Sequence, residues 1–445
     1  MQLMADRAVS DDPAVQRQLD RLATLSPGAD ILGLERISAL LARVGNPERK
    51  LPPVFHVAGT NGKGSTCAFL RAAIEASGLS AHVYTSPHLV RFNERIRIAG
   101  SLIDDALLAA LLEEVLDSGA DIGASFFEVT TAAAFLAFAR EPADACIVEV
   151  GLGGRLDATN VVPAPAVCGI AQLGIDHQAF LGSRIEDIAA EKAGIAKPGV
   201  PLVTLHYPDP LAERIAQAAG AAGARWLPRG DSWDAAVYRQ RLHYRDEDGK
   251  LDLPLPRLAG AHQAANAGLA VAMLRHQDAV PVRDSALRAA MGWADWPARL
   301  HRLGEGPLHA LLPKGAELWL DGGHNPAAAR AVADFFRGHV PSDRPFHVVF
   351  GLLANKDAAG VLKPFANRSM TLHAIPVPGH DHHAPADLVL AARAAGISAV
   401  AATDVEKALT WIGRHADRTQ PPIVLIMGSL YLAGDILRRN EQRPV

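Results

Sequence analysis

The segment with the clearest chemical potential runs from His56 to Ser65 and reads His-Val-Ala-Gly-Thr-Asn-Gly-Lys-Gly-Ser. Its glycines let backbone N–H groups converge on phosphate oxygens, and Lys63 supplies a positive point charge. The helix expected from Ser65 adds the positive end of its dipole. The spacing departs from the common P-loop, because Gly64 separates Lys63 from Ser65. The segment predicts a phosphate-binding loop; the alternative is a tight strand-to-helix turn with a solvated lysine.

A second candidate group is Glu149, near the end of a strand expected at residues 145–150. Doubly wound proteins bind ligands at the carboxyl ends of their parallel strands, so Glu149 is placed to hold Mg²⁺. A buried carboxylate without a partner is costly, and the alternative is therefore a glutamate paired with a nearby arginine. The Gly-Leu-Gly-Gly-Arg run at 151–155 can form an anion-facing loop, but the run alone is unspecific.

Two further groups follow in the chain. Asp176-His177 come after a strand expected at residues 167–173, which brings them to the same edge of the sheet. His177 is a candidate second metal ligand, and the alternative is an ordinary core or surface histidine. Residues 185–196 predict a helix that carries Glu191 and Lys192. By its spacing alone, Lys192 is interpreted as a surface lysine.

In three later motifs, polar residues stand next to glycine or proline. They are Gly260-Ala261-His262-Gln263 with Asn266, Trp296-Pro297-Ala298-Arg299-Leu300, and Leu320-Asp321-Gly322-Gly323-His324-Asn325-Pro326. An amide, a guanidinium and a carboxylate suit recognition of adenosine and phosphate, although each motif is unspecific by itself. The motif Gly379-His380-Asp381-His382-His383 has the composition of a metal-binding tract, but we interpret it as a solvated loop.

The elements that must position these groups alternate between strands and helices. Residues 54–58 predict a buried strand that enters the glycine-rich turn, and residues 65–76 predict the helix that leaves it. An amphipathic helix is expected before them, at Ile31–Val44. Further strands are expected at 81–84, 145–150, 167–173 and 201–205, with helices at 106–116 and 129–139. This alternation indicates an α/β fold with a doubly wound, mainly parallel sheet.

The pattern changes after residue 226. Residues 226–255 are polar and aromatic, and Asp-Glu-Asp-Gly at 246–249 predicts a hairpin turn in a small antiparallel excursion. A helix is expected at 262–276. Strands near 317–320, 347–350, 371–375 and 423–427 then alternate with helices again, which predicts a second, Rossmann-like α/β domain. With a linker near Trp296, the predicted domains are 1–296 and 297–445.

Composition narrows the class of protein. Hydrophobic residues make up 49% of the 445 residues and charged residues 21%, which is typical of globular chains with large cores. A formal net charge of −4 does not predict binding to nucleic acid or to an anionic membrane. Cys67, Cys146 and Cys168 lack CxxC spacing and are interpreted as reduced, packed thiols. The acidic leader Met1–Pro27 does not resemble a secretory signal and no stretch reaches transmembrane length, so we expect a cytoplasmic location.

The order of the motifs resembles the Mur ligase superfamily and, within it, the folylpolyglutamate synthase and dihydrofolate synthase family. The likeness runs from Gly33-Leu34-Glu35-Arg36-Ile37 to Gly428-Ser429-Leu430-Tyr431-Leu432. Its most specific pieces are His56–Ser65, Thr85–Leu89, Gly151–Asn160, Asp176-His177 and Asp321–Pro326. The resemblance implies an N-terminal P-loop domain of the Mur ligase central-domain type, which also holds the folate site, and a C-terminal Rossmann-like ligase domain.

The resemblance also implies roles for individual residues. ATP contacts are expected from Gly59, Thr60, Asn61, Gly62, Lys63, Gly64, Ser65, Asn266, Arg299 and Asp321. Two magnesium ions are expected, one held by Ser86 and Glu149 and the other held in part by His177. Lys192 resembles the family lysine that carbon dioxide carbamylates, which turns it into an anionic metal ligand. The expected pterin-binding region comprises Ser125, Phe126, Phe127, Glu128, Leu156, Asp157 and Ala158, and the expected catalytic residues are Lys63, Lys192 and His177.

Three positions depart from the pattern of the family. Ala298 and Gly323 stand where glycine and alanine are expected, and His301 stands where an acidic residue is expected. These differences bear on the shape of local loops rather than on the reaction.

The implied reaction is the ATP- and magnesium-dependent ligation of L-glutamate to dihydropteroate and to reduced folyl-glutamates, through an acyl phosphate. A monomer without nucleic-acid or membrane partners is expected. The run at 154–160 looks more like the bifunctional bacterial enzymes than like those restricted to chain extension. Three alternatives stay open: a synthase that only extends polyglutamate tails, a Mur-type ligase for a peptidoglycan precursor, and a module that senses ATP without ligating anything. The pair Phe126-Phe127 argues against the second of these.

Overall fold

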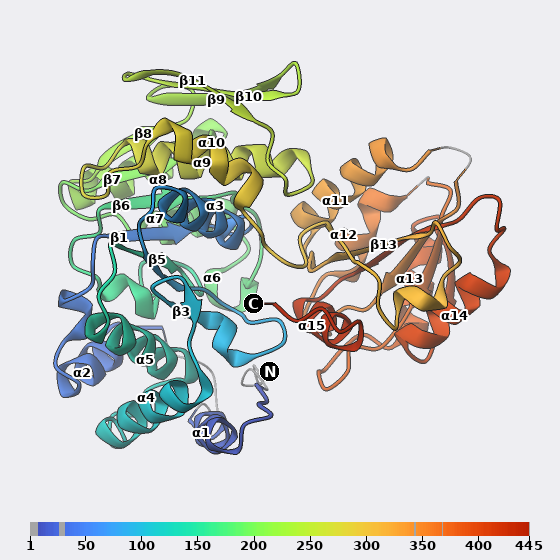
Figure 1. The fold of residues 1–445 in the computed structure, drawn as a ribbon, viewed down its shortest axis with the longest axis horizontal. Coiled ribbons are helices and arrows are strands. Elements are labelled where there is room, and N and C mark those ends of the chain that lie inside the picture. Colours follow the sequence, from blue (N-terminus) through green and yellow to red (C-terminus); the bar gives the residue numbers. More distant parts are fainter. Residues whose placement is uncertain (1–7, 26–31, 342–343, 367, 445) are drawn as a thin grey trace. The chain divides into compact units, whose positions relative to one another are not determined.

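The computed structural model of the protein describes residues 8–25, 32–341, 344–366 and 368–444. The chain divides into two compact units. The first comprises Met1–Arg257 and His262–Asp295, and the second comprises Leu258–Ala261 and Trp296–Val445. Each unit has its own sheet and its own helices (Figure 1).

The described part of the first unit contains an eight-stranded, mainly parallel sheet. Its strands are β1 (Val54–Ala58), β2 (Ala81–Tyr84), β3 (Ile96–Ile98), β4 (Ser101–Leu102), β5 (Ala145–Glu149), β6 (Val167–Ile170), β7 (Pro201–Thr204) and β8 (Arg225–Pro228). They follow the order β4-β3-β2-β5-β1-β6-β7-β8, and β3 and β4 are the antiparallel strands at one edge. The carboxyl ends of β1, β5 and β6, each followed by a candidate site segment, are therefore neighbours.

Helices cover both faces of this sheet. They are α1 (Pro13–Ala23), α2 (Glu35–Arg43), α3 (Lys63–Ala76), α4 (Asp105–Ser118), α5 (Phe126–Arg140), α6 (Gln178–Leu181), α7 (Ile185–Ala193), α8 (Asp209–Ala222), α9 (Ala261–Arg275) and α10 (Asp284–Trp293), with short 3₁₀ turns η1 (Pro47–Arg49), η2 (Phe92–Arg95) and η3 (Ala158–Val161). Because side chains alternate along a strand, Cys146 and Val148 of β5 face the core shared with α5, whereas Ile147 and Glu149 face α3.

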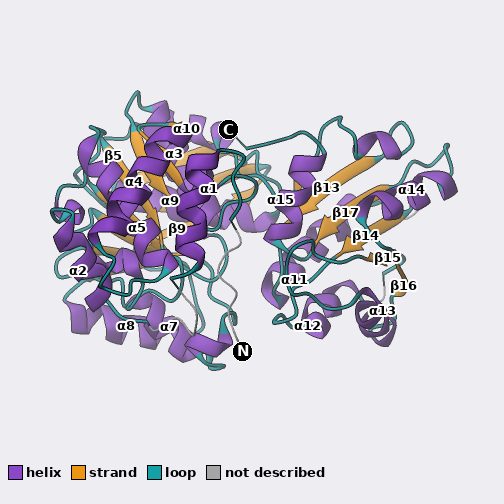
Figure 2. Ribbon diagram, turned by 90° about the horizontal axis from the view of Figure 1, so that it is seen from below, coloured by secondary structure: helices purple, strands orange, loops and turns teal. Residues whose placement is uncertain are grey.

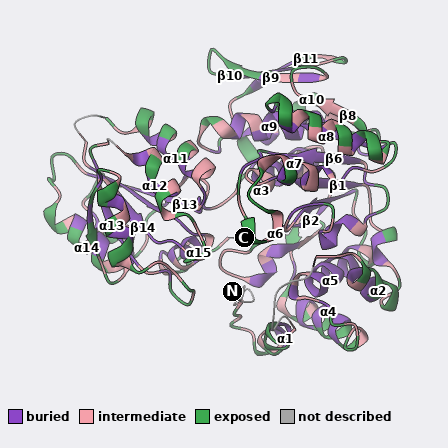
Figure 3. Cartoon of the chain, turned by 180° about the vertical axis from the view of Figure 1, so that it is seen from behind, coloured by how far each residue is buried: buried purple, intermediate pink, exposed green. Residues whose placement is uncertain are grey.

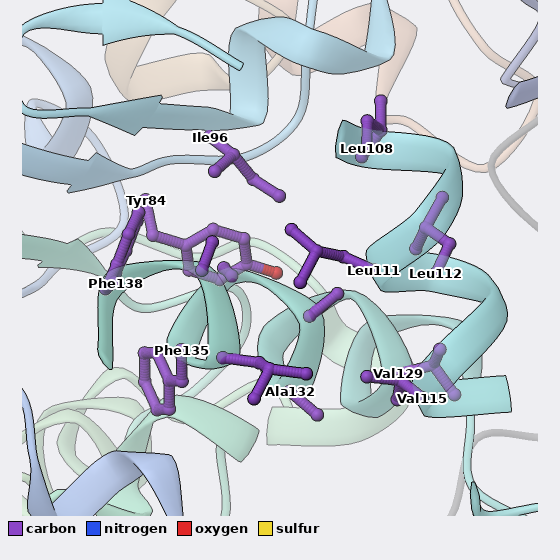
Figure 4. Packing of buried hydrophobic residues seen from close by; sticks show 14 of the residues in the cluster. Tyr84, Ile96, Leu108, Leu111, Leu112, Val115, Val129, Ala132, Phe135 and Phe138 are labelled. Atoms are coloured by element: carbon purple, nitrogen blue, oxygen red, sulfur yellow. The ribbon is translucent and has the colours of Figure 1, made fainter. Parts of the chain in front are cut away.

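The core on the α5 side holds α1, α2, α4 and α5 against β2 and β5. Figure 4 shows side chains such as Tyr84, Leu112 and Phe135 meeting in it. Figure 3 shows where the buried residues lie, on the strands and on the inward faces of these helices. Each large apolar side chain buried here contributes roughly 1.5–3 kcal/mol to the stability of the sheet and its helices.

A three-stranded antiparallel sheet follows in the chain, as expected between residues 226 and 255. It consists of β9 (Trp233–Tyr238), β10 (Arg241–Asp246) and β11 (Gly249–Pro254), in the order β11-β10-β9. Asp246 pairs with Gly249 across the expected hairpin turn. The sheet packs on α9 and α10, where a Cβ on Gly268 would lie 2.8 Å from the Cβ of Ala235 (Figure 1).

The described part of the second unit contains a six-stranded sheet in the order β12-β13-β17-β14-β15-β16, of which only β12 is antiparallel (Figure 2). The strands are β12 (His301–Arg302), β13 (Glu317–Asp321), β14 (Phe346–Phe350), β15 (Thr371–Ala374), β16 (Ser398–Ala401) and β17 (Ile423–Met427). The helices are α11 (Pro326–His339), α12 (Ala358–Leu362), α13 (Pro385–Ala394), α14 (Val405–His415) and α15 (Leu430–Arg439), with 3₁₀ turns η4 (His309–Leu311) and η5 (Lys363–Phe365). Helices α11, α12 and α13 share one core, whereas α14 and α15 contact the sheet separately, so this sheet is doubly wound.

The observed elements lie close to the expected ones, with differences at their ends. The strand expected at 167–173 ends at Ile170, because the chain beyond it turns to accept hydrogen bonds from the glycine-rich loop at Gln172. The helix expected from Ser65 already begins at Lys63. In the helix expected at Ile31–Val44, Ile31 lies outside the described residues and the helix itself spans Glu35–Arg43. No helix in the described ranges combines the length and apolar character needed to cross a membrane.

Two leucines of α13 provide a test of the core of the second unit. Leu388 is fully buried, whereas Leu390 is 65% exposed on the same helix. We expect Leu388→Ala to lower the free energy of unfolding by about 2–5 kcal/mol, because it removes packed methyl groups and leaves a cavity. The matched control Leu390→Ala should change it by less than about 0.5 kcal/mol. Urea unfolding followed by tryptophan fluorescence measures both, and equal effects would contradict this packing.

Candidate active site

The loop that follows β1 has a conformation that requires glycine. Gly62 adopts a φ of +85°, and a Cβ there would collide with the side-chain amide of Asn266 on α9. Gly59 lies against Ala171, so that a Cβ on Gly59 would be 3.0 Å from the Cβ of Ala171. Helix α3 then begins at Lys63 without a side-chain cap at Gly62. Backbone N–H groups of its first turn are therefore available to an anion.

The same loop is held from the side by the segment after β6. The backbone N–H groups of Thr60 and Asn61 donate to the carbonyl of Gln172 at 2.8 and 3.1 Å. The Thr60 hydroxyl donates to the carbonyl of Gly174 at 2.9 Å and accepts from the N–H of Gly174 at 3.1 Å. These bonds fix the course of the chain that leads to Asp176-His177.

A lysine and a glutamate of opposite charge face each other at the edge of the sheet. The Lys63 Nζ lies 3.8 Å from Oε1 of Glu149 and donates to the carbonyl of Gly59 at 3.2 Å. Glu149 is 4% exposed, and its Oε2 accepts from the backbone N–H of Ser86 at 3.3 Å. The structure thus pairs Glu149 with a lysine. The structure brings Lys63, Ser86 and Glu149 together from three different elements.

Lys192 is buried, so the interpretation of a surface lysine from its spacing is wrong. It is 5% exposed on α7, and within the described residues no hydrogen bond or ion pair reaches its Nζ. Burial, and to a smaller extent the positive charge of Lys63, lowers the pKa of this amine to about 7. The charges of Asp157 and Asp176 oppose this lowering of the pKa, which shows that both carboxylates are near enough to interact with Lys192.

The loop after β5 encloses Lys192 because its glycines permit close contact with α7. A Cβ on Gly154 would lie 2.8 Å from the carbonyl oxygen of Glu191 and 3.0 Å from Cα of Lys192. Arg155 reinforces the contact, since its N–H donates to the Glu191 carbonyl at 2.9 Å and its Nε meets Oε2 of Glu191 at 2.9 Å. Sequence reasoning missed this pair of residues, which lie 36 positions apart.

His177 is placed differently from the other candidate ligands. It is exposed, has a φ of +53° and precedes the single-turn helix α6. Its backbone N–H donates to the Asp176 carboxylate at 2.8 Å. The interaction between Asp176 and Lys192 puts this segment on the same side of the unit as Lys192.

The start of α5 carries the four consecutive residues expected at the pterin. Ser125 and Glu128 form a capping box, with Ser125 N–H donating to Glu128 at 2.6 Å and Glu128 N–H to the Ser125 hydroxyl at 3.3 Å. Glu128 also pairs with Arg36 at 3.1 Å, a contact that sequence reasoning missed. Phe126 is buried, and the ring of Phe127 occupies the space that a Cβ on Gly151 would take. The α5 start and the loop after β5 are therefore in contact.

Asp157, in the second half of the expected pterin region, is nearly fully buried between Leu156 and Ala158. Its Oδ2 accepts from the N–H of Leu152 at 2.8 Å, and its Oδ1 accepts from the N–H of Thr159 at 3.0 Å and from the Thr159 hydroxyl at 2.5 Å. Burial raises the pKa of Asp157, and these hydrogen bonds oppose the rise. Ala158 is buried and Leu156 is half-buried.

Candidate residues of the second unit gather at the end of β13. The buried carboxylate of Asp321 accepts from the N–H of Leu300 at 2.8 Å and from the N–H of Gly323 at 2.7 Å. Arg299 donates to the carbonyl of Ala298 at 2.9 Å. Ala298 adopts a φ of +57°, a conformation that costs a non-glycine residue about 1–2 kcal/mol and that accounts for the expectation of glycine there.

The histidine side chains of the loop at 379–383, whose residues are exposed or half-buried, contact neighbouring groups. The ring of His380 stacks on Tyr431 with centroids 3.9 Å apart. His382 Nδ1 lies 2.7 Å from the carbonyl of His380, and His383 Nε2 lies 2.9 Å from the carbonyl of Lys356. Throughout the described ranges, no three histidine, cysteine, aspartate or glutamate side chains form a group that could hold a metal ion.

Family models match both units of the chain. Residues 57–274 match the Mur ligase middle domain, and residues 309–430 match the Mur ligase glutamate ligase domain. The dihydrofolate synthase/folylpolyglutamate synthase of Bacillus subtilis is 33% identical over 92% of this chain and 94% of its own length.

Two solved structures share the fold across both units. The E. coli FolC structure in complex with DHPP and ADP has a TM-score of 0.86 and 31% identity, and covers 96% of this chain and 97% of its own. A bifunctional folylpolyglutamate synthase/dihydrofolate synthase with Mn, AMPPNP and L-glutamate bound has a TM-score of 0.83 and 32% identity over 95% and 97%. These matches cover the candidate site segments as well as both sheets. The chain belongs to the dihydrofolate synthase/folylpolyglutamate synthase family of Mur ligases.

Proposed function

We propose that this chain is an ATP-dependent ligase that joins L-glutamate to dihydropteroate and to reduced folyl-glutamates. The observation that carries the proposal is the pair formed by the buried Glu149 and the partly exposed Lys63 beside the glycine loop, in a chain whose relatives bear both synthase names. A solved relative was crystallised with DHPP and ADP, and another with AMPPNP and L-glutamate. These ligands correspond to the acceptor, the nucleotide and the amine that the reaction needs.

The charges in the site suit phosphoryl transfer from ATP. Backbone N–H groups at the start of α3, from Gly62 to Ser65, and the Lys63 ammonium bind the γ-phosphate oxygens and stabilise the charge that develops on them. The substrate carboxylate attacks the γ-phosphorus, the bond to the β-phosphate oxygen breaks, and an acyl phosphate and ADP result. The glutamate amine then attacks the acyl carbon. Loss of phosphate and of one proton leaves the amide.

A divalent cation fits the donor groups beside Lys63. Glu149 supplies one buried carboxylate and Ser86 supplies a hydroxyl oxygen, and Mg²⁺ is commonly bound by one or two carboxylates together with substrate phosphates. When bound, the cation neutralises phosphate oxygens. His177 is proposed for a second ion, and Asn266, Arg299 and Asp321 are proposed nucleotide contacts.

We further propose that Lys192 is carbamylated. Carbon dioxide reacts with the neutral form of an amine, and burial keeps much of the Lys192 amine neutral near pH 7. The carbamate carries a negative charge, which would compensate the nearby charge of Lys63 and make the side chain an anionic metal ligand. We also propose that the enzyme is cytoplasmic and monomeric, and that residues 1–296 and 297–445 form its two domains.

The first prediction concerns Lys63. Lys63→Ala should lower kcat by at least about a hundredfold and leave the circular dichroism spectrum unchanged, because it removes charge from the phosphate loop and little from a core. Lys250→Ala is the matched control, since Lys250 is exposed on β11. Phosphate release with Mg-ATP, glutamate and dihydropteroate measures both variants. A wild-type kcat in Lys63→Ala would rule out the phosphate-loop assignment.

The second prediction concerns Lys192. Lys192→Ala should lose activity that short carboxylic acids restore in part, because these can take the place of the carbamate. Reaction of the wild-type amine with ¹³CO₂ should increase as the pH rises through about 7, since deprotonation produces the reactive neutral amine. ¹³C NMR detects the carbamate. Full activity in carbon dioxide-free buffer, together with an unmodified lysine by mass spectrometry, would contradict the proposal.

The third prediction separates the two ligase activities. Purified protein should add labelled glutamate both to dihydropteroate and to a tetrahydrofolate monoglutamate when each is supplied alone. Extension of tetrahydrofolate without any product from dihydropteroate would identify a synthase that only extends tails. ATP binding without phosphate release in the presence of all substrates would instead favour the ATP-sensing module.

A further inference from the structure

A buried chain of three polar side chains connects β1 with the loop after β5. His56 and Thr159 are both 0% exposed, and Asp157 is 3% exposed. The His56 Nε2 lies 2.8 Å from the Thr159 hydroxyl oxygen, which in turn lies 2.5 Å from Oδ1 of Asp157. The roles proposed above for the phosphate loop and for the pterin region use neither His56 nor Thr159.

The chemistry of the three groups fixes the direction of the hydrogen bonds. Thr159 has one hydroxyl proton and donates it to the Asp157 carboxylate, so its oxygen must accept from the Nε2–H of His56. The Nδ1 of His56 is buried and has no hydrogen-bond partner among the described residues. An Nδ1–H tautomer would bury an unsatisfied donor, which is costly. Burial also lowers the pKa of His56 to about 3, so the ring is a neutral donor at working pH.

The hydrogen bonds of Asp157 leave it little freedom. A carboxylate has about four acceptor positions. Thr159 occupies two of them on Oδ1, through its N–H and its hydroxyl, and the N–H of Leu152 occupies one on Oδ2. About one position therefore stays open on Oδ2. The Asp157 side chain already caps the η3 turn by accepting from the backbone N–H of Thr159. The turn therefore requires neither the Thr159 hydroxyl nor the buried histidine that bonds to it.

We propose that His56 is a positioning residue for the acceptor ring: through the Thr159 hydroxyl it fixes the Asp157 carboxylate, which offers its one open acceptor position to an N–H of the pterin. This inference rests on the proposed function, in which Asp157 contacts the pterin. The loop that carries Asp157 also touches the aromatic residue Phe127 through Gly151. An aromatic surface beside a single fixed acceptor suits a flat heterocycle with N–H donors.

Variants of Thr159 test the proposal. Thr159→Val keeps the shape but removes the hydroxyl, and it should raise KM for dihydropteroate about tenfold while KM for Mg-ATP changes by less than about twofold. Thr159→Ser keeps the hydroxyl and should stay within about threefold of wild type for both. If wild-type protein does not use dihydropteroate, a tetrahydrofolate monoglutamate takes its place, because it carries the same ring. Equal KM values for the acceptor in Thr159→Val and wild type would overturn the proposal.

The hydrogen-bond chain is also measurable without turnover. In protein with ¹⁵N-labelled histidine, His56 should show a neutral ring protonated at Nε2 from pH 6 to pH 8, and Thr159→Val should shift its Nε2–H resonance. His56→Leu should raise KM for the acceptor by about the same factor as Thr159→Val, and the double variant should add little, since both break one chain. A ring protonated at Nδ1, or additive effects of the two substitutions, would overturn the proposal.

Discussion

A buried carboxylate at the carboxyl end of β5 must be compensated, and the lysine at the start of α3 compensates it. Glu149 and Lys63 can meet because β1 and β5 are neighbours in the sheet, with Val57 paired to Glu149. The glycine loop between β1 and α3 must then turn within a few residues, and the N–H groups of Thr60 and Asn61 hold this turn against the Gln172 carbonyl. Each charge lowers the cost of holding the other out of water, Glu149 at the buried strand end and Lys63 at the partly exposed start of the helix. The phosphate loop and the acidic strand end therefore form one electrostatic unit.

A second constraint is the close packing of the loop after β5 on α7. Gly154 touches the backbone of Glu191 and Lys192, and Arg155 fastens the contact by an ion pair with Glu191. The contact removes the Lys192 amine from water and lowers its pKa to about 7. The two lysines near the loop thus differ in chemistry. Lys63 is paired with a carboxylate, whereas Lys192 is a buried amine suited to reaction with an electrophile.

The expected pterin region is held in place by hydrogen bonds among its own residues. Ser125 and Glu128 cap α5 and bind each other, and Glu128 also holds Arg36. Asp157 shapes its own loop through three hydrogen bonds. Side chains that are held by several hydrogen bonds lose little conformational entropy when a ligand binds. The bonds that order this region would therefore also favour binding of the proposed ligand.

The sequence by itself determined the class of fold, the order of its elements and the residue types of the site. Apolar runs bounded by glycine identified the strands, and the spacing around Lys63 and Glu149 identified the groups that end at one sheet edge, because both signals are local. Only the tertiary structure decided that Lys192 is buried, that Glu149 pairs with Lys63, and that His56 reaches Thr159 across 103 positions. Burial, pKa and tautomer depend on neighbours brought from distant segments by packing, and the spacing of residues along one helix or strand does not contain them.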